Sequence, residues 1–225
     1  MFLKSLIDLL YPHLCIGCNQ GLQAHEQHLC TSCLYHLPQT HFHRVRENPV
    51  EKIFWGRCSV ERAYAYIYFK KEGIGQKILH QLKYKGNQEL ATFLGKTYGN
   101  QLKELELLPD AVVAVPLHKS KLCKRGYNQS ACFAQGIAEA LSIADLSHAV
   151  GKKTATETQT RKSRFERWMN VSEVFTVKDA AVLENKHLLV CDDVITTGAT
   201  LEALIKCLPA TCKISVCAIA LPVKG

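Results

Sequence analysis

The clearest feature of the sequence is the stretch His187-Leu-Leu-Val-Cys-Asp-Asp-Val-Ile-Thr-Thr-Gly-Ala-Thr200, in which an apolar run, two acids and a turn rich in threonine follow one another. The apolar residues 188–190 are typical of a parallel strand that is buried on both faces. Asp192 and Asp193 are then predicted at the carboxyl end of this strand, where open α/β sheets bind ligands. The stretch therefore predicts an α/β fold with a binding site at this point.

The turn that follows the two acids has the composition of a phosphate-binding turn. Its backbone N–H groups and hydroxyls can surround a phosphate, and the helix expected to start there adds partial positive charge at its N-terminus. We assign Asp192 and Asp193 to ribose hydroxyls, which donate hydrogen bonds to ionised carboxylates. The pattern predicts a ribose 5-phosphate site. The predicted phosphate ligands are Thr196, Thr197, Gly198, Ala199 and Thr200.

Length and composition are those of a globular protein. The chain has 225 residues, 47% hydrophobic and 21% charged, which is enough for one α/β domain and a small appendage. Its 28 basic and 20 acidic residues give a net charge of +8, which favours anionic partners such as phosphates or nucleic acid. Residues 1–11 resemble a short amphipathic helix whose apolar run is interrupted by Asp8, so we expect neither a secretory signal nor a membrane span and predict a cytoplasmic protein.

Four of the 11 cysteines form two CxxC pairs, Cys15 with Cys18 and Cys30 with Cys33. Four thiolates at this spacing complete the tetrahedron that Zn²⁺ accepts, so the pairs predict a structural zinc site. Four free or buried cysteines are one alternative. A redox dithiol is another, although a redox centre needs only one pair.

The sequence predicts two parts in the chain. Residues 1–58 are predicted to form the amphipathic helix, the four-cysteine zinc finger and a linker, because residues 38–58 are polar and sustain no period. Residues 59–225 alternate strand and helix patterns, which predicts a parallel sheet with helices on both faces. The strand candidates are residues 63–69, 110–116, 174–177, 186–190 and 213–221, and the helix candidates are residues 73–86, 87–107 and 128–140.

A basic segment follows the strand candidate at residues 110–116. The sequence His118-Lys-Ser-Lys-Leu-Cys-Lys-Arg-Gly126 holds four basic residues and is predicted to be an exposed loop. Taken alone, this segment is explained equally well as a run of charged side chains in solvent or as a binding loop. Together with the acid pair, it predicts a ligand with a phosphate at one end and a diphosphate at the other. The predicted diphosphate ligands are Lys119, Lys121, Lys124 and Arg125.

Residues 156–170 form a third polar segment without an apolar period. A loop of this size inside a compact domain is often a lid or a binding loop, and a disordered surface connection is the alternative. Its cations are candidates for contacts with nucleic-acid phosphates. These candidates are Arg161, Lys162, Arg164 and Arg167.

The run Val190–Thr200 resembles the phosphoribosyl pyrophosphate (PRPP) signature of type I phosphoribosyltransferases. Several companions resemble the ComF family of competence-associated proteins, over nearly the whole chain. They are Val115-Pro-Leu-His118, Lys124-Arg-Gly-Tyr-Asn-Gln129, Thr156-x2-Gln159 with Arg167 and Asn170, and the double CxxC. The resemblance implies a type I phosphoribosyltransferase-like fold, an amino-terminal zinc finger and the handling of single-stranded DNA during natural transformation.

The resemblance also implies roles at the site. Asp192 and Asp193 fall on the catalytic acids that bind the ribose hydroxyls, and Mg²⁺ accompanies PRPP to neutralise the leaving diphosphate. The first hypothesis is a ComF-type protein that binds PRPP and handles single-stranded DNA, with competence-machinery proteins as further partners. The second is an active phosphoribosyltransferase, a glycosyltransferase that acts on an unknown acceptor in nucleotide or cofactor metabolism. A purely structural scaffold leaves the acid pair unexplained.

Overall fold

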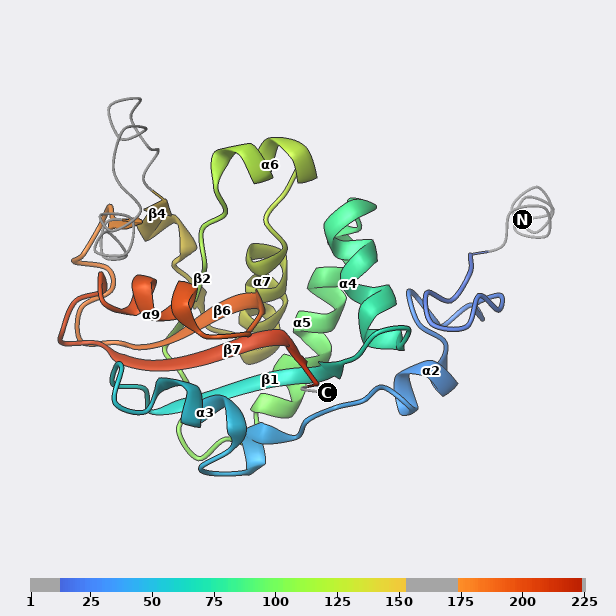
Figure 1. Ribbon diagram of the computed structural model, residues 1–225, viewed down its shortest axis with the longest axis horizontal. Coiled ribbons are helices and arrows are strands. Elements are labelled where there is room, and N and C mark those ends of the chain that lie inside the picture. The colour runs from blue at the N-terminus through green and yellow to red at the C-terminus, as the bar shows by residue number, and fades with distance from the viewer. Residues whose placement is uncertain (1–12, 153–173, 224–225) are drawn as a thin grey trace.

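A five-stranded sheet organises the chain in the computed structural model, which describes residues 13–152 and 174–223 (Figure 1). Every pair of neighbouring strands in it is parallel. The strands are β1 (Arg62–Phe69), β2 (Ala111–Ala114), β3 (Ala144–Asp145), β6 (His187–Val194) and β7 (Lys213–Pro222). Their order across the sheet is β1-β7-β6-β2-β3.

Helices cover both faces of this sheet. They are α3 (Pro49–Phe54), α4 (Ile74–Tyr84), α5 (Gln88–Leu102), α7 (Gln129–Leu141) and α9 (Ala199–Ile205). Helices α4, α5 and α7 share one hydrophobic cluster with Leu189, whereas α3 and α9 share another with Leu188. Neighbouring residues of a strand point to opposite faces, which explains why these two leucines enter different clusters. The predicted fold class is confirmed.

Most of the predicted elements are present. Asn87 and Asn128 each cap a helix as expected, because their side chains accept hydrogen bonds from Leu90 N (3.0 Å) and Ser130 N (3.2 Å). Helix α5 nevertheless ends at Leu102, several residues before the predicted end at 107. The chain needs these residues to turn back toward β2. Among the described residues, no helix has the length and apolar character that a bilayer crossing requires.

Two sequence predictions were wrong in detail. Residues 174–177 contain β5 (Phe175–Val177), but this strand pairs antiparallel with β4 (Val150–Lys152) in a separate two-stranded sheet. The basic segment forms helix α6 (Lys119–Arg125) instead of a loop. It shows no apolar period because none of its residues is buried, and the His118 side chain and Gly126 (φ 78°) cap its two ends.

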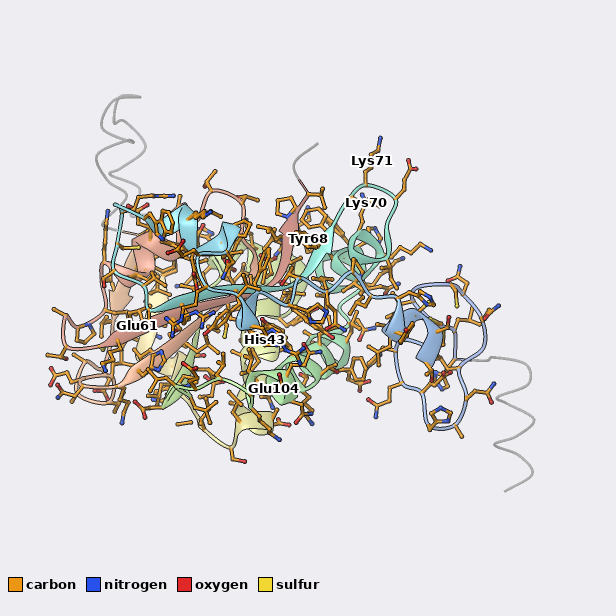
Figure 2. The ribbon with its side chains drawn as sticks, turned by 90° about the horizontal axis from the view of Figure 1, so that it is seen from below. His43, Glu61, Tyr68, Lys70, Lys71 and Glu104 are labelled. Atoms are coloured by element: carbon orange, nitrogen blue, oxygen red, sulfur yellow. The ribbon has the colours of Figure 1, made fainter. Side chains whose placement is uncertain are left out.

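The predicted linker is also more ordered than its sequence indicates. It contains the short helices η1 (Phe42–Arg44) and α3, and its first residues pair with the edge strand β1. Tyr68 N donates to Pro38 O (2.7 Å), and Thr40 N donates to Tyr66 O (3.0 Å). In Figure 2, Glu61 lies at one end of β1, and Tyr68, Lys70 and Lys71 lie at the other. The pairing covers part of an otherwise open sheet edge.

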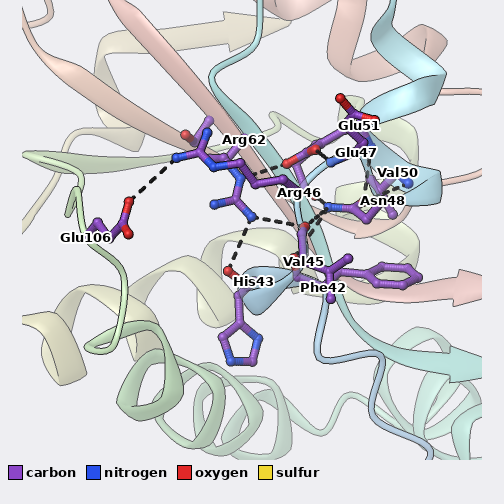
Figure 3. Close-up of polar contacts among 12 residues, drawn as sticks. Phe42, His43, Val45, Arg46, Glu47, Asn48, Val50, Glu51, Arg62 and Glu106 are labelled. Atoms are coloured by element: carbon purple, nitrogen blue, oxygen red, sulfur yellow. Dashed lines mark hydrogen bonds and ion pairs between the residues drawn. The ribbon is translucent and has the colours of Figure 1, made fainter.

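Polar contacts fix α3 against β1 (Figure 3). The Asn48 side chain accepts from Val50 N (2.9 Å) at the start of α3 and donates to Ala63 O (3.0 Å) of β1. The Arg62 guanidinium donates to Glu51 of α3 (2.7 Å) and to Val45 O (3.1 Å). These contacts are a cap, an ion pair and bonds to backbone carbonyls, and polar contacts of this kind cannot be read from the hydrophobic pattern of the sequence.

Candidate functional site

The site begins at the point where the order of the strands reverses. Strands β2 and β6 are neighbours, but the next strand after β2 is β3 on one side, and the next after β6 is β7 on the other. The connections therefore diverge on either side of the carboxyl ends of β2 and β6, which is the place where doubly wound sheets bind ligands. Asp192 and Asp193 lie at this end of β6, as predicted.

Asp192 is a buried acid, with 9% of its surface exposed. Its Oδ1 accepts hydrogen bonds from Ser130 Oγ of α7 (3.0 Å) and from Asp193 N (2.8 Å). Burial raises the pKa of Asp192 to about 7, and the charge of Asp193 adds to the rise, whereas the two hydrogen bonds oppose it. This carboxyl group therefore exchanges its proton near neutral pH.

Asp193 is surrounded by cations from two helices. Its carboxylate lies 3.2 Å from Lys83 Nζ of α4 and 3.9 Å from Arg125 Nη1 of α6. Arg125 was predicted at the site, but Lys83 was not. Lys83 lies in an amphipathic helix, where a lysine is usually solvated, and only the packing of α4 against the sheet brings it to the acid pair.

The end of α4 is tied to the junction between α6 and α7. Tyr127 Oη donates to Leu82 O (2.7 Å), and Gln129 Nε2 donates to the same carbonyl (3.1 Å). Burial raises the pKa of Tyr127 to about 12, which keeps its hydroxyl a donor. Asn128 Nδ2 donates to Val115 O (2.9 Å), just beyond β2. These bonds hold Lys83 and Arg125 in place around Asp193.

Lys152, at the end of β4, is a second cation that the sequence did not reveal. Burial lowers the pKa of Lys152, the positive charge of Lys121 lowers it further, and Asp192 raises it. Lys152 therefore interacts electrostatically with both Asp192 and Lys121. Among the described residues, Lys119, Lys121 and Lys124 form no ion pair. Lys119 and Lys124 are exposed.

The predicted phosphate turn directly follows β6. Thr196, Thr197, Ala199 and Thr200 are exposed, and Gly198 is buried with φ 73°. Only glycine adopts this left-handed conformation readily. The exposed threonine hydroxyls are donors that a phosphate can use.

A separate groove of about 1210 Å³ lies between residues 22–28 and α5. Its charged members are Glu26, Glu89 and Lys96. Because acids outnumber cations there, the groove does not have the charge that a phosphate ligand requires.

The four cysteines of the CxxC pairs come together as predicted. Their sulfur atoms all lie within 4.8 Å of one another, and Cys18 Sγ is 3.7 Å from Cys30 Sγ. Tetrahedral Zn–S bonds of about 2.3 Å require sulfur atoms about 3.8 Å apart, so this donor set fits Zn²⁺. Lys77 Nζ of α4 donates to Gly17 O (2.6 Å) and attaches the first pair to the rest of the structure.

Some predicted residues lie outside the part of the chain that the structure describes. They are the amphipathic segment 1–11 and the nucleic-acid candidates Arg161, Lys162, Arg164 and Arg167.

The fold and the site define an α/β protein with acids and cations at the switch point of a parallel sheet and a four-cysteine cluster near its N-terminus. By sequence, the chain is 28% identical over 201 residues to DNA utilization protein YhgH of Escherichia coli K12, covering 85% of this chain and 82% of that protein. It is 25% identical to Competence protein ComFC of Bacillus subtilis, covering 86% of this chain and 77% of that protein.

Competence protein F of Haemophilus influenzae is 35% identical over a shorter region, 45% of this chain and 44% of that protein. The predicted resemblance to the ComF family is confirmed by these matches. No family model matches the chain.

Solved structures with some similarity to the chain include two proteins with phosphoribosyl chemistry in their names. One is the glutamine PRPP amidotransferase of B. subtilis, with 22% identity, a TM-score of 0.37 and coverage of 56% of this chain and 25% of that chain. The other is the adenine phosphoribosyltransferase of Leishmania tarentolae, with 11% identity, a TM-score of 0.38 and coverage of 61% and 73%. At these TM-scores, the fold class rests on the sheet itself.

We expect the four cysteines to hold one zinc ion per chain. Substitution Cys30→Ser removes one sulfur ligand, so the purified variant should contain little zinc by elemental analysis and should unfold at a lower temperature than the wild type. Cys123→Ser, at an exposed cysteine outside the cluster, is the matched control. Equal zinc contents in the two variants would rule out this metal site.

We expect Asp192→Asn to stabilise the protein in a pH-dependent manner. An acid whose pKa is higher in the folded state binds more protons there, so Asp192 lowers the free energy of unfolding as pH rises from about 4 to about 7. Asparagine can accept the same two hydrogen bonds and carries no charge. The stability gained should therefore be larger at pH 8 than at pH 5, on the order of 1–4 kcal/mol at pH 8.

Urea denaturation at the two pH values measures this difference. Asp179→Asn, the same substitution at an exposed acid, serves as the matched control. A pH-independent effect of Asp192→Asn would contradict the burial of an acid with a raised pKa.

Proposed function

We propose that this protein binds PRPP with Mg²⁺ at the switch point of its sheet and handles single-stranded DNA in natural transformation. The observation that carries the proposal is the pair Asp192 and Asp193, which is followed by the threonine turn (residues 196–200). Asp193 forms ion pairs with Lys83 and Arg125, and Lys152 interacts electrostatically with Asp192. A ligand with hydroxyls between two phosphate groups complements this site. The acids can accept hydrogen bonds from its hydroxyls, and the cations and the threonine hydroxyls can bind its phosphates.

The acids are suited to the ribose of such a ligand. Ionised carboxylates accept hydrogen bonds from vicinal hydroxyls, and they keep their negative charge when they do so. Lys83 and Arg125 balance the charge of Asp193, so that the pair does not repel the ligand's phosphates. The threonine turn follows the acids closely in the chain, so it would bind the 5-phosphate of the same ligand.

The cations are suited to the diphosphate. Arg125 and Lys121 belong to α6, and the charges of Lys121 and Asp192 both act on Lys152. Mg²⁺ typically binds through one or two carboxylates together with substrate phosphates, which is the donor set that this site offers. When bound, the ion would neutralise the charge on the diphosphate as it leaves.

Transfer of the phosphoribosyl group to an acceptor is a second candidate function. It is favoured by Asp192, because a carboxyl group with a pKa of about 7 can give or take a proton at physiological pH.

The role in DNA handling is supported by the names of the relatives and by helix α6. The relatives are called a DNA utilization protein and competence proteins. Helix α6 has no buried residue, and Lys119 and Lys124 on it are exposed. Cations of this kind contact nucleic-acid phosphates. The candidates Arg161, Lys162, Arg164 and Arg167 lie outside the described residues and stay a prediction.

We expect the wild-type chain to bind PRPP in the presence of Mg²⁺, with one site per chain by isothermal titration calorimetry. The double variant Asp192→Asn/Asp193→Asn should lose at least about tenfold in affinity, because it removes both ionised acceptors for the ribose hydroxyls. Asp179→Asn is the control and should bind as the wild type does. A wild-type chain that does not bind PRPP would refute the proposal. Release of pyrophosphate on addition of an acceptor would establish the second candidate function.

We expect single-stranded DNA to bind with a strong dependence on salt. The double variant Lys119→Ala/Lys124→Ala removes two phosphate contacts, so the slope of log K against log salt should become shallower by about 1.4. Fluorescence anisotropy with a labelled oligonucleotide at several salt concentrations measures the slope. Lys70→Ala/Lys71→Ala, at the end of β1, is the matched control (Figure 2). Binding that does not change with salt would contradict a phosphate surface.

A further inference from the structure

Arg57 contacts the backbone of the threonine turn, although it comes from a segment that the sequence predicts to be a linker. Its Nη1 donates to Thr197 O (2.6 Å) and to Ile53 O (3.1 Å). Its Nε donates to Glu202 Oε2 (2.9 Å), and the two side chains form an ion pair. Arg57 therefore joins α3, the turn and α9.

The bond to Thr197 O determines where the next amide points. In a trans peptide, the carbonyl oxygen of one residue and the N–H of the following residue point in opposite directions. Because Thr197 O points toward Arg57, the N–H of Gly198 points away from it, to the opposite side of the turn.

The turn also rests directly on α3. A Cβ atom added to Gly198 would lie 2.7 Å from Ile53 Cγ2 and 3.1 Å from Phe54 Cε1, so a side chain at this position would collide with side chains of α3. Helix α3 is itself fixed to β1 by Asn48 and Arg62 (Figure 3). The turn thus has a rigid support on its inner side.

The charge of Arg57 is already balanced. Glu202 lies in the first turn of α9, and Arg57 and Lys206 both pair with it, the latter at 2.6 Å. Hydrogen bonds from Lys206 and Arg57 lower the pKa of Glu202, which keeps it ionised. Arg57 is consequently suited to hold the turn and to neutralise an acid beside a phosphate, and it does not serve as a phosphate ligand itself.

We propose that Arg57 is a positioning residue that orients the Gly198 amide toward the 5-phosphate of the ligand. This inference rests on the proposed function, because it concerns the same site. It makes the segment around α3 a part of the binding site.

The test compares two fragments of PRPP on the intact chain by calorimetry. Ribose 5-phosphate depends on the turn, whereas pyrophosphate with Mg²⁺ depends on the cations of α6. Arg57→Gln should weaken the binding of ribose 5-phosphate by about tenfold and leave pyrophosphate within about twofold. Arg57→Lys retains a donor and should recover part of the loss. Glu202→Gln keeps the bond to Thr197 O and should not weaken ribose 5-phosphate.

Arg44→Gln is the matched control, because Arg44 forms an exposed pair with Glu104 away from the turn. An Arg57→Gln variant that binds ribose 5-phosphate as the wild type does would overturn the positioning role alone. An equal loss for both fragments would also overturn it, by showing a general loss of structure, which the zinc content and the melting temperature would confirm. A wild-type chain that binds neither fragment would remove the proposed function and this inference together.

Discussion

The parallel pairing of β2 with β6 is the constraint on which the site depends. It brings together two strands that are far apart in the sequence and whose chains then leave in opposite directions. Neither connection crosses over the carboxyl ends of these two strands, which is where doubly wound sheets bind ligands. Every group at the site is placed relative to this switch point, including the acids of β6, the helix α6 that follows β2, and the threonine turn that follows β6.

The buried acid at this position is costly, and the surrounding structure offsets the cost. Asp192 keeps hydrogen bonds from Ser130 and from the backbone of Asp193, and the cations Lys83 and Arg125 balance the acid beside it. Burial still raises its pKa to about 7. A core residue without charge would serve stability better, so this arrangement is typical of a site retained for binding or chemistry.

Part of the fold and of the candidate site could be predicted from the sequence, because some of their features are local. The run from His187 to Thr200 carries strand, acids and turn within one segment, the asparagine caps are adjacent to their helices, and the CxxC pairs carry their own spacing. Lys83, Lys152 and Arg57 could not be predicted, since each reaches the site only through tertiary packing. The regular structure of residues 38–58 and the helical conformation of α6 were not predicted, for another reason. Helix α6 buries no residue and is fixed by its two caps, and residues 38–58 are held mainly by caps and backbone carbonyls, with an apolar spacing only in the short helix α3, where Val50 and Phe54 are buried.

The central claim is that the switch point binds a ribose with phosphates at both ends, and an experimental structure of the chain with PRPP and Mg²⁺ tests it most directly. We expect the ribose hydroxyls at Asp192 and Asp193, the 5-phosphate within hydrogen-bond distance of the Gly198 amide, and the diphosphate beside Arg125. Density for the ligand in the groove between residues 22–28 and α5, with the switch point empty, would contradict it.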